Sequence, residues 1–472
     1  MLWHPQKKCH GKGRRFDKNK KQESSMSNSL NLDVSTFMDS RKMSARQWVV
    51  LFLGFMVLVF DGFDTTAIGF IAPALIDDWG VLRHDLGPVM MSGLLGLAFG
   101  SLTAGPLADR FGRRPVIIGS VLLFGFWSLA SAWSTGIVSL TVLRFLTGVG
   151  LGASMPNTAT LVSEFAPKRY RSHMVSFIYC GFAFGAAMGG LGSEWLIEQF
   201  GWRSVLVVGG VLPIAFALLL LLSLPESIRF LAQNSALKER LIKAINKVVP
   251  GLADSQTRFH SSEASIKETG KVSALFASGY SLGTCMIWIT LFMGLLTMYL
   301  LSSWLPLLSR DAGLSMGEAA LLGSLLQIGG MLGNFTVGMK MDRWDHHKVV
   351  GLTVFCGGAC AVLIALQQPT MQVLCPLILL LGYFLNGVNV GGYALAAAFY
   401  PTQIRATGVC WATGIGRLGA ISGAGIGALM LAAQWNFSQV FLFLAIPSLI
   451  GVMALWIKGR KRRTSAIPTA VN

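Results

Sequence analysis

Two aspartates lie close together in an apolar stretch of the chain, VLVFDGFDTTAIGF. Asp61 and Asp64 are three residues apart, so a helix places both carboxyl groups on one face. An acid near the centre of a membrane-spanning helix costs about 2.5–3.5 kcal/mol, which favours contact with water, a cation or a proton. Desolvation and the neighbouring like charge disfavour ionisation. We therefore interpret the pair as a proton-coupling group; the alternative is a structural pair neutralised by a nearby arginine.

Two arginines also lie in apolar stretches, Arg144 in RFLTGVGLG and Arg417 in GIGRLGAISG. The guanidinium group keeps its charge and has a planar fork that suits a carboxylate. Arg144 is expected to pair with one of the two aspartates or to bind an anionic substrate. Arg417, far along the chain, is a second candidate for binding a substrate carboxylate.

Aromatic rings and amides near the middle of apolar segments are candidates to line a binding site for an aromatic substrate. Each of them is also explained by ordinary helix packing. The candidate substrate-binding side chains, in addition to the two arginines, are Asn157, Tyr299, Trp304, Asn386, Tyr393 and Trp411, with Phe60, Phe63 and Asn389 as further possibilities.

The composition indicates that these side chains belong to a membrane protein. Of the 472 residues, 53% are hydrophobic and only 13% are charged, against about 25% charged in soluble proteins. The net charge of +17 would suggest nucleic-acid binding in a soluble chain. The basic residues, however, concentrate on one side of the expected membrane, because the opposite loops carry only Arg83, Arg203 and Arg310. This asymmetry predicts cytoplasmic termini and a lipid bilayer, not nucleic acid, as the partner.

Apolar runs long enough to cross a bilayer predict an all-α membrane protein of twelve helices in two parallel six-helix repeats. The expected domains are a cytoplasmic tail (1–47, of which 1–25 is expected to be dispensable), a six-helix bundle (48–224), a cytoplasmic central loop (225–283), a second bundle (284–457) and a cytoplasmic tail (458–472). The expected spans are 48–76, 86–107, 116–134, 139–163, 172–198, 203–224, 284–308, 316–339, 349–367, 373–399, 408–433 and 438–457.

Two loop motifs recur at nearly the same offset in the two halves, which indicates an internal repeat. The sequence G-x3-D-R begins at Gly105 and again at Gly338, and P-x3-R begins at Pro167 and again at Pro401. Repeated acids and arginines at helix ends are interpreted as a cytoplasmic gate that opens and closes during transport. The candidate gating residues are Asp109, Arg110, Arg113, Glu164, Arg171, Asp342, Arg343 and Arg405.

Metal and enzyme chemistry find no support in the sequence. The seven cysteines have no CxxC spacing, and Cys356 and Cys360 share a helix face without a neighbouring His or acid. The apolar spans contain no cluster of nucleophile and base and no phosphate-binding loop. We expect no cofactor beyond protons as the coupling ion, and a chain that acts as a monomer. A signalling receptor is the rival of another class, and it would bind without uptake.

Several motifs resemble known transporters over essentially all of 48–457. GPLADRFGRRP, RFLTGVGLG and PESIRFL resemble the major facilitator superfamily. DGFDTTAIGFIAPAL, GASMPNTATLVSEFAP and FYPTQIRATGVCWATGIGRLGAI are similar to the aromatic acid/proton symporters within it, which include bacterial 4-hydroxybenzoate and protocatechuate transporters. The paired DR turns alone indicate only the superfamily, whereas the DGxD segment is more specific.

The resemblance implies proton-coupled uptake of hydroxylated benzoates across the bacterial inner membrane. By motif it assigns the acidic pair to Asp61 and Asp64 and the buried arginine to Arg144, and it adds the loop residues Asp109, Glu164, Asp342, Arg405 and Arg417. Tyr393 is bulkier than the residue typical of the 4-hydroxybenzoate carriers, so vanillate, benzoate, gallate and muconate remain open as substrates. A sugar or organic-ion carrier shares PESxR and the DR turns, but LFMGLLTMYLLSSWLP lacks the glutamines usual in sugar carriers.

Overall fold

The computed structural model is almost entirely helical. It describes residues 31–33, 43–167, 170–227, 230–231, 239, 242, 258–260, 272–277, 280–367, 370–400 and 402–465. The first half of the chain forms α3 (Ala45–Trp79), η1 (Arg83–Leu86), α4 (Gly87–Phe111), α5 (Arg113–Ser131), α6 (Ile137–Phe165), α7 (Arg171–Phe200) and α8 (Arg203–Ser223). The second half forms η4 (Val272–Phe276), α11 (Ser281–Asp311), α12 (Met316–Arg343), α13 (His346–Leu366), α14 (Met371–Phe399), α15 (Thr402–Ala432), α16 (Phe437–Phe443) and α17 (Ala445–Ser465).

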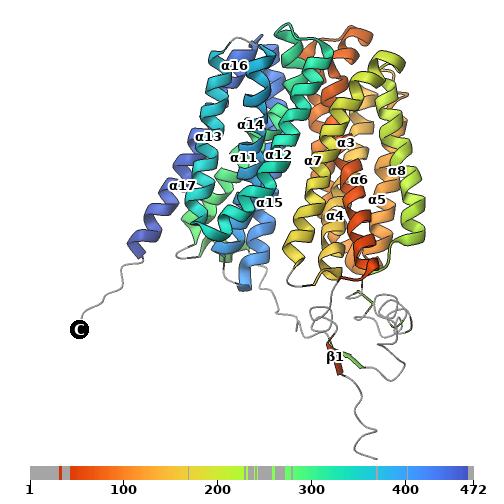
Figure 1. The fold of residues 1–472 in the computed structure, drawn as a ribbon, viewed down its shortest axis with the longest axis vertical. Coiled ribbons are helices and arrows are strands. Elements are labelled where there is room, and N and C mark those ends of the chain that lie inside the picture. The colour runs from red at the N-terminus through yellow and green to blue at the C-terminus, as the bar shows by residue number, and fades with distance from the viewer. Residues whose placement is uncertain are drawn as a thin grey trace, which may run out of the picture.

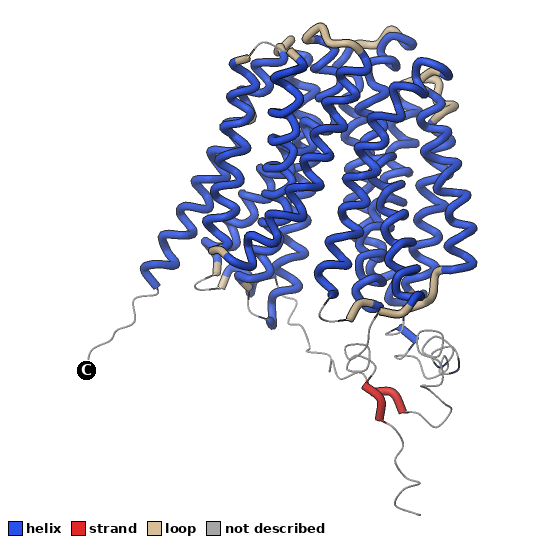
Figure 2. Tube along the Cα trace, in the orientation of Figure 1, coloured by secondary structure: helices blue, strands red, loops and turns tan. Residues whose placement is uncertain are grey.

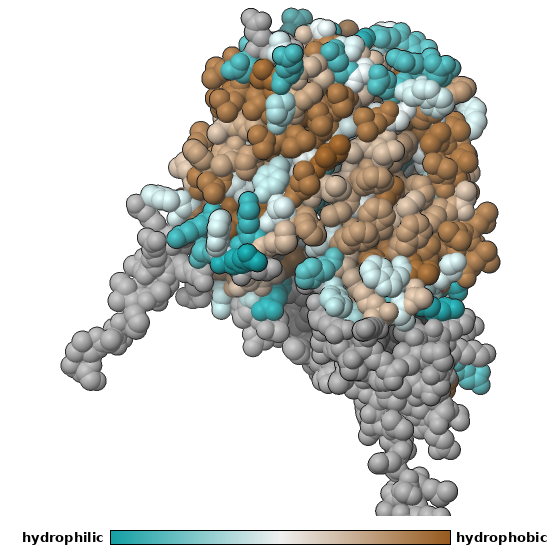
Figure 3. Space-filling model, viewed as in Figure 1, coloured by the Kyte–Doolittle hydropathy of each residue, from teal (hydrophilic) through white to brown (hydrophobic). Residues whose placement is uncertain are grey.

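Twelve helical segments in the described part of the chain are long and apolar enough to cross a membrane, the last of them Phe437–Ile457. The prediction of twelve spans is therefore confirmed. On the face that Figure 3 shows, apolar side chains predominate below the polar upper end, and Leu222 and Val138 are 87% and 79% exposed in the structure. Such a band suits contact with lipid. Helix starts follow local rules: Ser44 and Gln47 form a capping box at the start of α3, and Gly80 ends that helix at φ 62°.

The two halves of the chain form two bundles that lie side by side (Figure 1). Their internal packing matches, because α3 contacts α7 and α4 contacts α6 in the first bundle, as α11 contacts α15 and α12 contacts α14 in the second. Between the bundles, α7 packs against α12 and α4 packs against α15. This arrangement confirms the parallel repeat that the duplicated motifs predict.

The two ends of the helical body differ. The start of α3 and the end of α17 lie at one end, which we call the tail side, and the opposite end, the far side, carries short connecting loops (Figure 2). The bundles converge at the far side and spread apart toward the tail side (Figure 1). On the tail side, a short parallel pair joins β1 (Asn31–Asp33) to β2 (Arg258–His260), which the helical interpretation of the sequence does not predict.

Helices α3 and α7 touch backbone to backbone beside the acidic pair. A Cβ atom added to Gly62 would lie 1.9 Å from the carbonyl oxygen of Phe182, and one added to Gly185 would lie 1.9 Å from that of Val59. Only glycine permits so close an approach. The contact fixes the rotation of α3, and with it the direction in which the side chains of Asp61 and Asp64 point.

Candidate functional site

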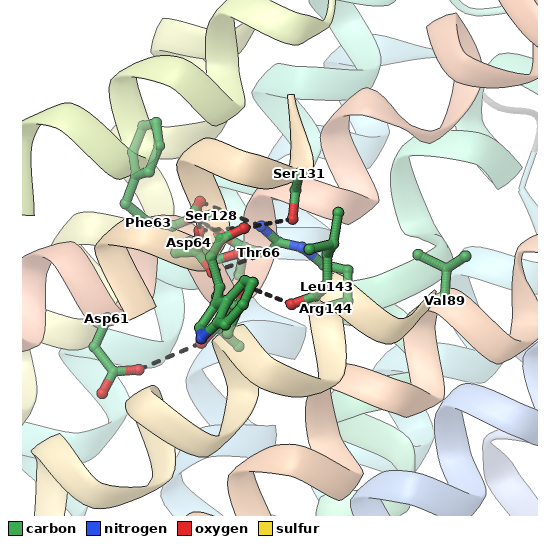
Figure 4. Close-up of polar contacts among 12 residues, drawn as sticks. Asp61, Phe63, Asp64, Thr66, Val89, Ser128, Ser131, Leu143 and Arg144 are labelled. Carbon is green, nitrogen blue, oxygen red and sulfur yellow. Dashed lines mark hydrogen bonds and ion pairs between the residues drawn. The ribbon is translucent and has the colours of Figure 1, made fainter. Parts of the chain in front are cut away.

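The centre of the first bundle contains a buried ion pair. Asp64 of α3 and Arg144 of α6 are 0% and 4% exposed, and the Arg144 Nη1 and Nη2 atoms donate to Asp64 Oδ2 at 3.0 Å and Oδ1 at 3.3 Å. Ser128 of α5 donates its hydroxyl to Asp64 and accepts from Arg144 Nη2 at 3.2 Å. Figure 4 shows these three side chains converging from three helices. Of the two partners that the sequence allows for Arg144, the structure selects Asp64.

Asp61 lies one helical turn nearer the tail side and has different partners. Its carboxylate accepts from the hydroxyls of Ser154 at 2.8 Å and Thr65 at 3.3 Å, and it is fully buried. Figure 4 shows it apart from the cluster around Asp64. The two acids share the predicted helix face but sit in separate settings, one with a cation and one with hydroxyl donors.

A cavity of about 570 Å³ lies between the two bundles. Helices of both halves line it, with Asp64 and Arg144 on the wall of the first bundle and Asn386 on the wall of the second. Three tyrosines, Tyr179, Tyr299 and Tyr393, are also in its lining. A volume of this size suits a small organic molecule.

Arg417 of α15 is half-buried and brings a second positive charge to the lining of this cavity. Its Nη1 atom donates to the carbonyl oxygen of Leu97 in α4, 2.9 Å away in the other bundle. In the part of the chain that the structure describes, Arg417 has no ion-pair partner. This end of the cavity therefore presents a cation and phenolic hydroxyls, the groups that bind a carboxylate.

Three residues predicted to bind substrate lie outside the cavity lining. Asn157 is buried and donates to the carbonyl oxygen of Ala153 in its own helix at 2.8 Å. Trp304 is 0% exposed, and its indole donates to the carbonyl oxygen of Ala424 at 2.8 Å within the second bundle. Trp411, 43% exposed, stacks on Trp288 at 6.0 Å. All three are satisfied by helix packing, the alternative that the sequence leaves open.

Conversely, the sequence interpretation misses two side chains in the cavity lining, Tyr179 of α7 and Asn334 of α12. Asn334 lies four residues before the repeated motif at Gly338, but a single uncharged polar side chain in an apolar helix gives little indication of the face on which it lies.

The loop between α4 and α5 on the tail side is held by an acid from a distant segment. Asp109 pairs with Arg113, four residues later in the chain, at 2.8 Å. Glu226 Oε1 accepts from the backbone N–H groups of Arg113 at 2.8 Å and Arg114 at 3.1 Å, across from the turn at Gly112, whose φ is 99°. Glu226 lies in the PESIRFL motif, but its role was not anticipated. A carboxylate at the start of α5 stabilises that helix end.

The remaining candidate gating residues have mixed surroundings. Glu164 accepts from the hydroxyl of Ser227, and the Arg405 Nε atom donates to the carbonyl oxygen of Tyr400 at 3.2 Å. The contacts of Asp109, Arg113 and Arg405 stay within their own bundles. Of the others, Arg110 lies over the ring of Phe111 at 5.3 Å, Arg343 is exposed, Arg171 is half-buried with an unbonded Nε atom, and the side chain of Asp342 lies outside the described residues.

Besides the Arg417–Leu97 contact at the cavity, two ties between the bundles lie toward the far side. Arg83, next to α4, pairs with Asp311 at the end of α11 at 2.7 Å. The Ser324 hydroxyl of α12 donates to the carbonyl oxygen of Ala187 in α7 at 3.0 Å. These contacts join the halves where the helices converge (Figure 1).

The Major Facilitator Superfamily model matches residues 54–371 and 287–471. The chain belongs to this superfamily. It is 47% identical over 429 residues to the 4-hydroxybenzoate transporter PcaK of Pseudomonas aeruginosa, covering 91% of this chain and 96% of the relative. It is 42% identical over 438 residues to the gallate transporter of Pseudomonas putida, covering 92% and 97%. The inward-open xylose transporter XylE of Escherichia coli has the same fold, with a TM-score of 0.69, 17% identity and coverage of 88% and 96%.

These matches make the chain a multi-pass membrane transporter and not an enzyme. The predicted fold and family are confirmed. Among the described residues, no group of three or more His, Cys, Asp or Glu is placed to hold a metal ion.

Proposed function

We propose that this chain takes up aromatic carboxylates together with protons, and that hydroxylated benzoates such as 4-hydroxybenzoate or protocatechuate are its substrates. The observation that carries the proposal is Arg417, a permanent cation that faces a cavity between the bundles without an acidic partner in the described part of the chain. A substrate carboxylate supplies the missing negative charge, and the cavity tyrosines donate to it.

The relatives support the substrate class. Proteins 47% and 42% identical to this chain are named as transporters of 4-hydroxybenzoate and gallate, both of them hydroxylated benzoates. Vanillate, benzoate and muconate remain alternatives within the class of organic acids. A sugar or organic-ion carrier is the weaker alternative, because the likeness to the xylose transporter is one of fold alone, at 17% identity.

Proton coupling is assigned to the two acids of α3. Asp64 has a cation as its partner and lines the cavity, so a change in its protonation is felt both by Arg144 and by a bound anion. Asp61 is buried among hydroxyl donors and lies within reach of the charge of Arg417. No cofactor is required, because the substrate and the protons are the only species that move.

Transport is proposed to proceed by alternating access in the inner membrane of a bacterium. With the tail side in the cytoplasm, as the distribution of basic residues favours, the described arrangement has its bundles joined on the outside and spread inside. Rocking of one bundle against the other would reverse this, with the tail-side charges acting as the cytoplasmic gate. A single chain contains both bundles and the cavity between them, so the transporter is proposed to act as a monomer.

Uptake of a labelled panel of benzoates tests the proposal. Cells that make the protein should accumulate 4-hydroxybenzoate, and a protonophore should abolish the accumulation. Arg417→Gln should lose uptake while it still inserts, whereas Arg46→Gln, at an exposed position near the start of α3, should behave as the wild type. Accumulation that survives the protonophore would refute proton coupling, and accumulation of none of the panel would refute the substrate class.

A further inference from the structure

In the described part of the chain, three glycines line the cavity between the bundles, Gly69, Gly93 and Gly148. Helix packing requires two of them. A Cβ atom added to Gly69 of α3 would lie 2.9 Å from the carbonyl oxygen of Ser302 in α11. One added to Gly148 of α6 would lie 2.1 Å from the carbonyl oxygen of Gly93 in α4. Glycine at such positions lets two helix backbones approach closely, so packing explains both.

Gly93 is different, because the space beside its own Cα atom is open. Beyond the backbone of its own helix, a Cβ atom added there would have a single neighbour within 4 Å among the described residues, the carbonyl oxygen of Arg144 at 3.8 Å. The backbone at Gly93 is helical and has no positive φ, so any residue can adopt it. Glycine inside a helix is less favourable than alanine. Neither packing nor backbone conformation therefore explains why position 93 has no side chain.

Gly93 lies close to the place where Arg417 reaches the first bundle. Arg417 donates to the carbonyl oxygen of Leu97, which follows Gly93 by four residues in α4. Gly93 and Leu97 both line the cavity, on one face of the helix and about 6 Å apart along its axis. On α4 the lining runs from Val89 to Leu97. A ring that is held at Arg417 by its carboxylate and lies along α4 therefore meets the wall at Gly93.

We propose that Gly93 is the bare part of the cavity wall on which the ring of the substrate lies, and that the absence of a side chain there determines how large a benzoate the transporter accepts. This inference rests on the proposed function. A flat ring can contact the backbone of α4 across the width that a side chain would occupy. A methyl group at position 93 would project into that space without a close contact to another helix. It would therefore reduce the room for the ligand and leave the protein itself unstrained.

Equilibrium binding of labelled 4-hydroxybenzoate and gallate to the purified variants tests this role. Gallate carries hydroxyls at both meta positions, so it needs more room than 4-hydroxybenzoate whichever edge of the ring faces α4. Gly93→Ala should weaken the binding of gallate by at least about tenfold, the effect of one carbon atom in a binding pocket, and that of 4-hydroxybenzoate by less. Gly93→Val should weaken the binding of 4-hydroxybenzoate by at least about tenfold as well.

Thermal unfolding distinguishes a contact with substrate from a role in packing. Because alanine favours the helix and has space at position 93, Gly93→Ala should unfold at the same temperature as the wild type or at a higher one. Gly119→Ala and Gly119→Val are the matched controls. A Cβ atom at this exposed position of α5 would have nothing within 4 Å, and Gly119 lies outside the cavity lining. Both control variants should bind the two compounds as the wild type does.

A wild type that binds neither compound would overturn the proposed function itself. A wild type that binds 4-hydroxybenzoate, together with a folded Gly93→Val protein that binds it equally tightly, would overturn the role of Gly93 alone. A Gly93→Ala protein that unfolds at a lower temperature than the wild type would also overturn that role, because packing would then require the glycine.

Discussion

Replacement of Asp64 by Asn tests the contribution of the negative charge to the buried ion pair, because it removes that charge alone. Asparagine keeps the shape of the side chain and an oxygen that can accept from Arg144 and Ser128. It leaves the Arg144 guanidinium, 4% exposed, without its counter-charge. Removal of one partner of a buried pair costs about 3–5 kcal/mol, which is a factor of at least about 100 in the unfolding equilibrium.

The double variant Asp64→Asn with Arg144→Gln distinguishes a lost charge from a lost shape. Two neutral amides can hydrogen-bond to each other and leave no charge buried, so most of the 3–5 kcal/mol should return. Unfolding of the purified proteins, followed by tryptophan fluorescence, gives the free energies for the four-member cycle. An Asp64→Asn protein as stable as the wild type, or a double variant no more stable than Asp64→Asn, would refute the reasoning.

The same set of variants distinguishes a role of the ion pair in transport from a role in stability. Asp64→Asn should insert in the membrane but lose uptake driven by a pH gradient, and the stable double variant should remain inactive, because neither can exchange a proton at this position. Recovery of uptake together with stability would show that the pair is structural, which is the alternative that the sequence leaves open for the acids of α3.

Two further changes test how the bundles are held. Arg83→Gln breaks the pair with Asp311, whose members are 55% and 19% exposed, so the lost interaction should be worth about 0–1 kcal/mol. Labelling, from the far side, of a cysteine introduced into the cavity lining should then increase by up to about fivefold. A concentration of 1 M salt should have the same effect on the protein with Arg83, and unchanged labelling would argue against a far-side gate. Gly185→Ala places a Cβ atom 1.9 Å from the Val59 backbone and should destabilise the protein by about 1–3 kcal/mol or more. Gly192→Ala is the control, because its added Cβ atom would have nothing within 4 Å, and it should not destabilise the protein. Equal unfolding free energies for the two variants would contradict the close packing of α3 on α7.

Much of the fold could be predicted because lipid imposes a long apolar run on every span. The expected span 203–224 corresponds to Arg203–Ser223, and 373–399 corresponds to Met371–Phe399. The span predicted as 48–76 is longer in the structure, Ala45–Trp79, because its polar ends, with a capping box at Ser44, continue the helix beyond the apolar run. Length and hydropathy reveal the part of a helix in lipid and not its polar ends.

Site residues could be predicted from the sequence where burial of the side chain in an apolar segment is energetically costly. They were harder to predict where the side chain is common in ordinary helix packing. Charges in apolar segments identified Asp64, Arg144 and Arg417, all of which line the cavity. Rings and amides gave a weaker signal, because Trp304 and Tyr299 lie in the same helix and only the latter faces the cavity. Which face of a helix points inward depends on its contact with the neighbouring helix, as at Gly62, and that contact is set by residues distant in the sequence.

The two charged sites of the cavity suggest why substrate and proton would travel together. Protonation of Asp64 removes the counter-charge of Arg144 and on its own incurs the same penalty as Asp64→Asn. A carboxylate in the cavity can relieve that penalty, because Arg144 lines the cavity. The favourable states are then the one with neither proton nor carboxylate bound and the one with both bound. Linkage requires the proton and the carboxylate each to strengthen the binding of the other by the same factor. On this reasoning the wild type binds 4-hydroxybenzoate more tightly as pH falls, whereas Asp64→Asn, with Arg144 already unpaired, loses that part of the pH dependence. Equal pH dependence in both proteins would place the coupling proton elsewhere, with Asp61 as the next candidate.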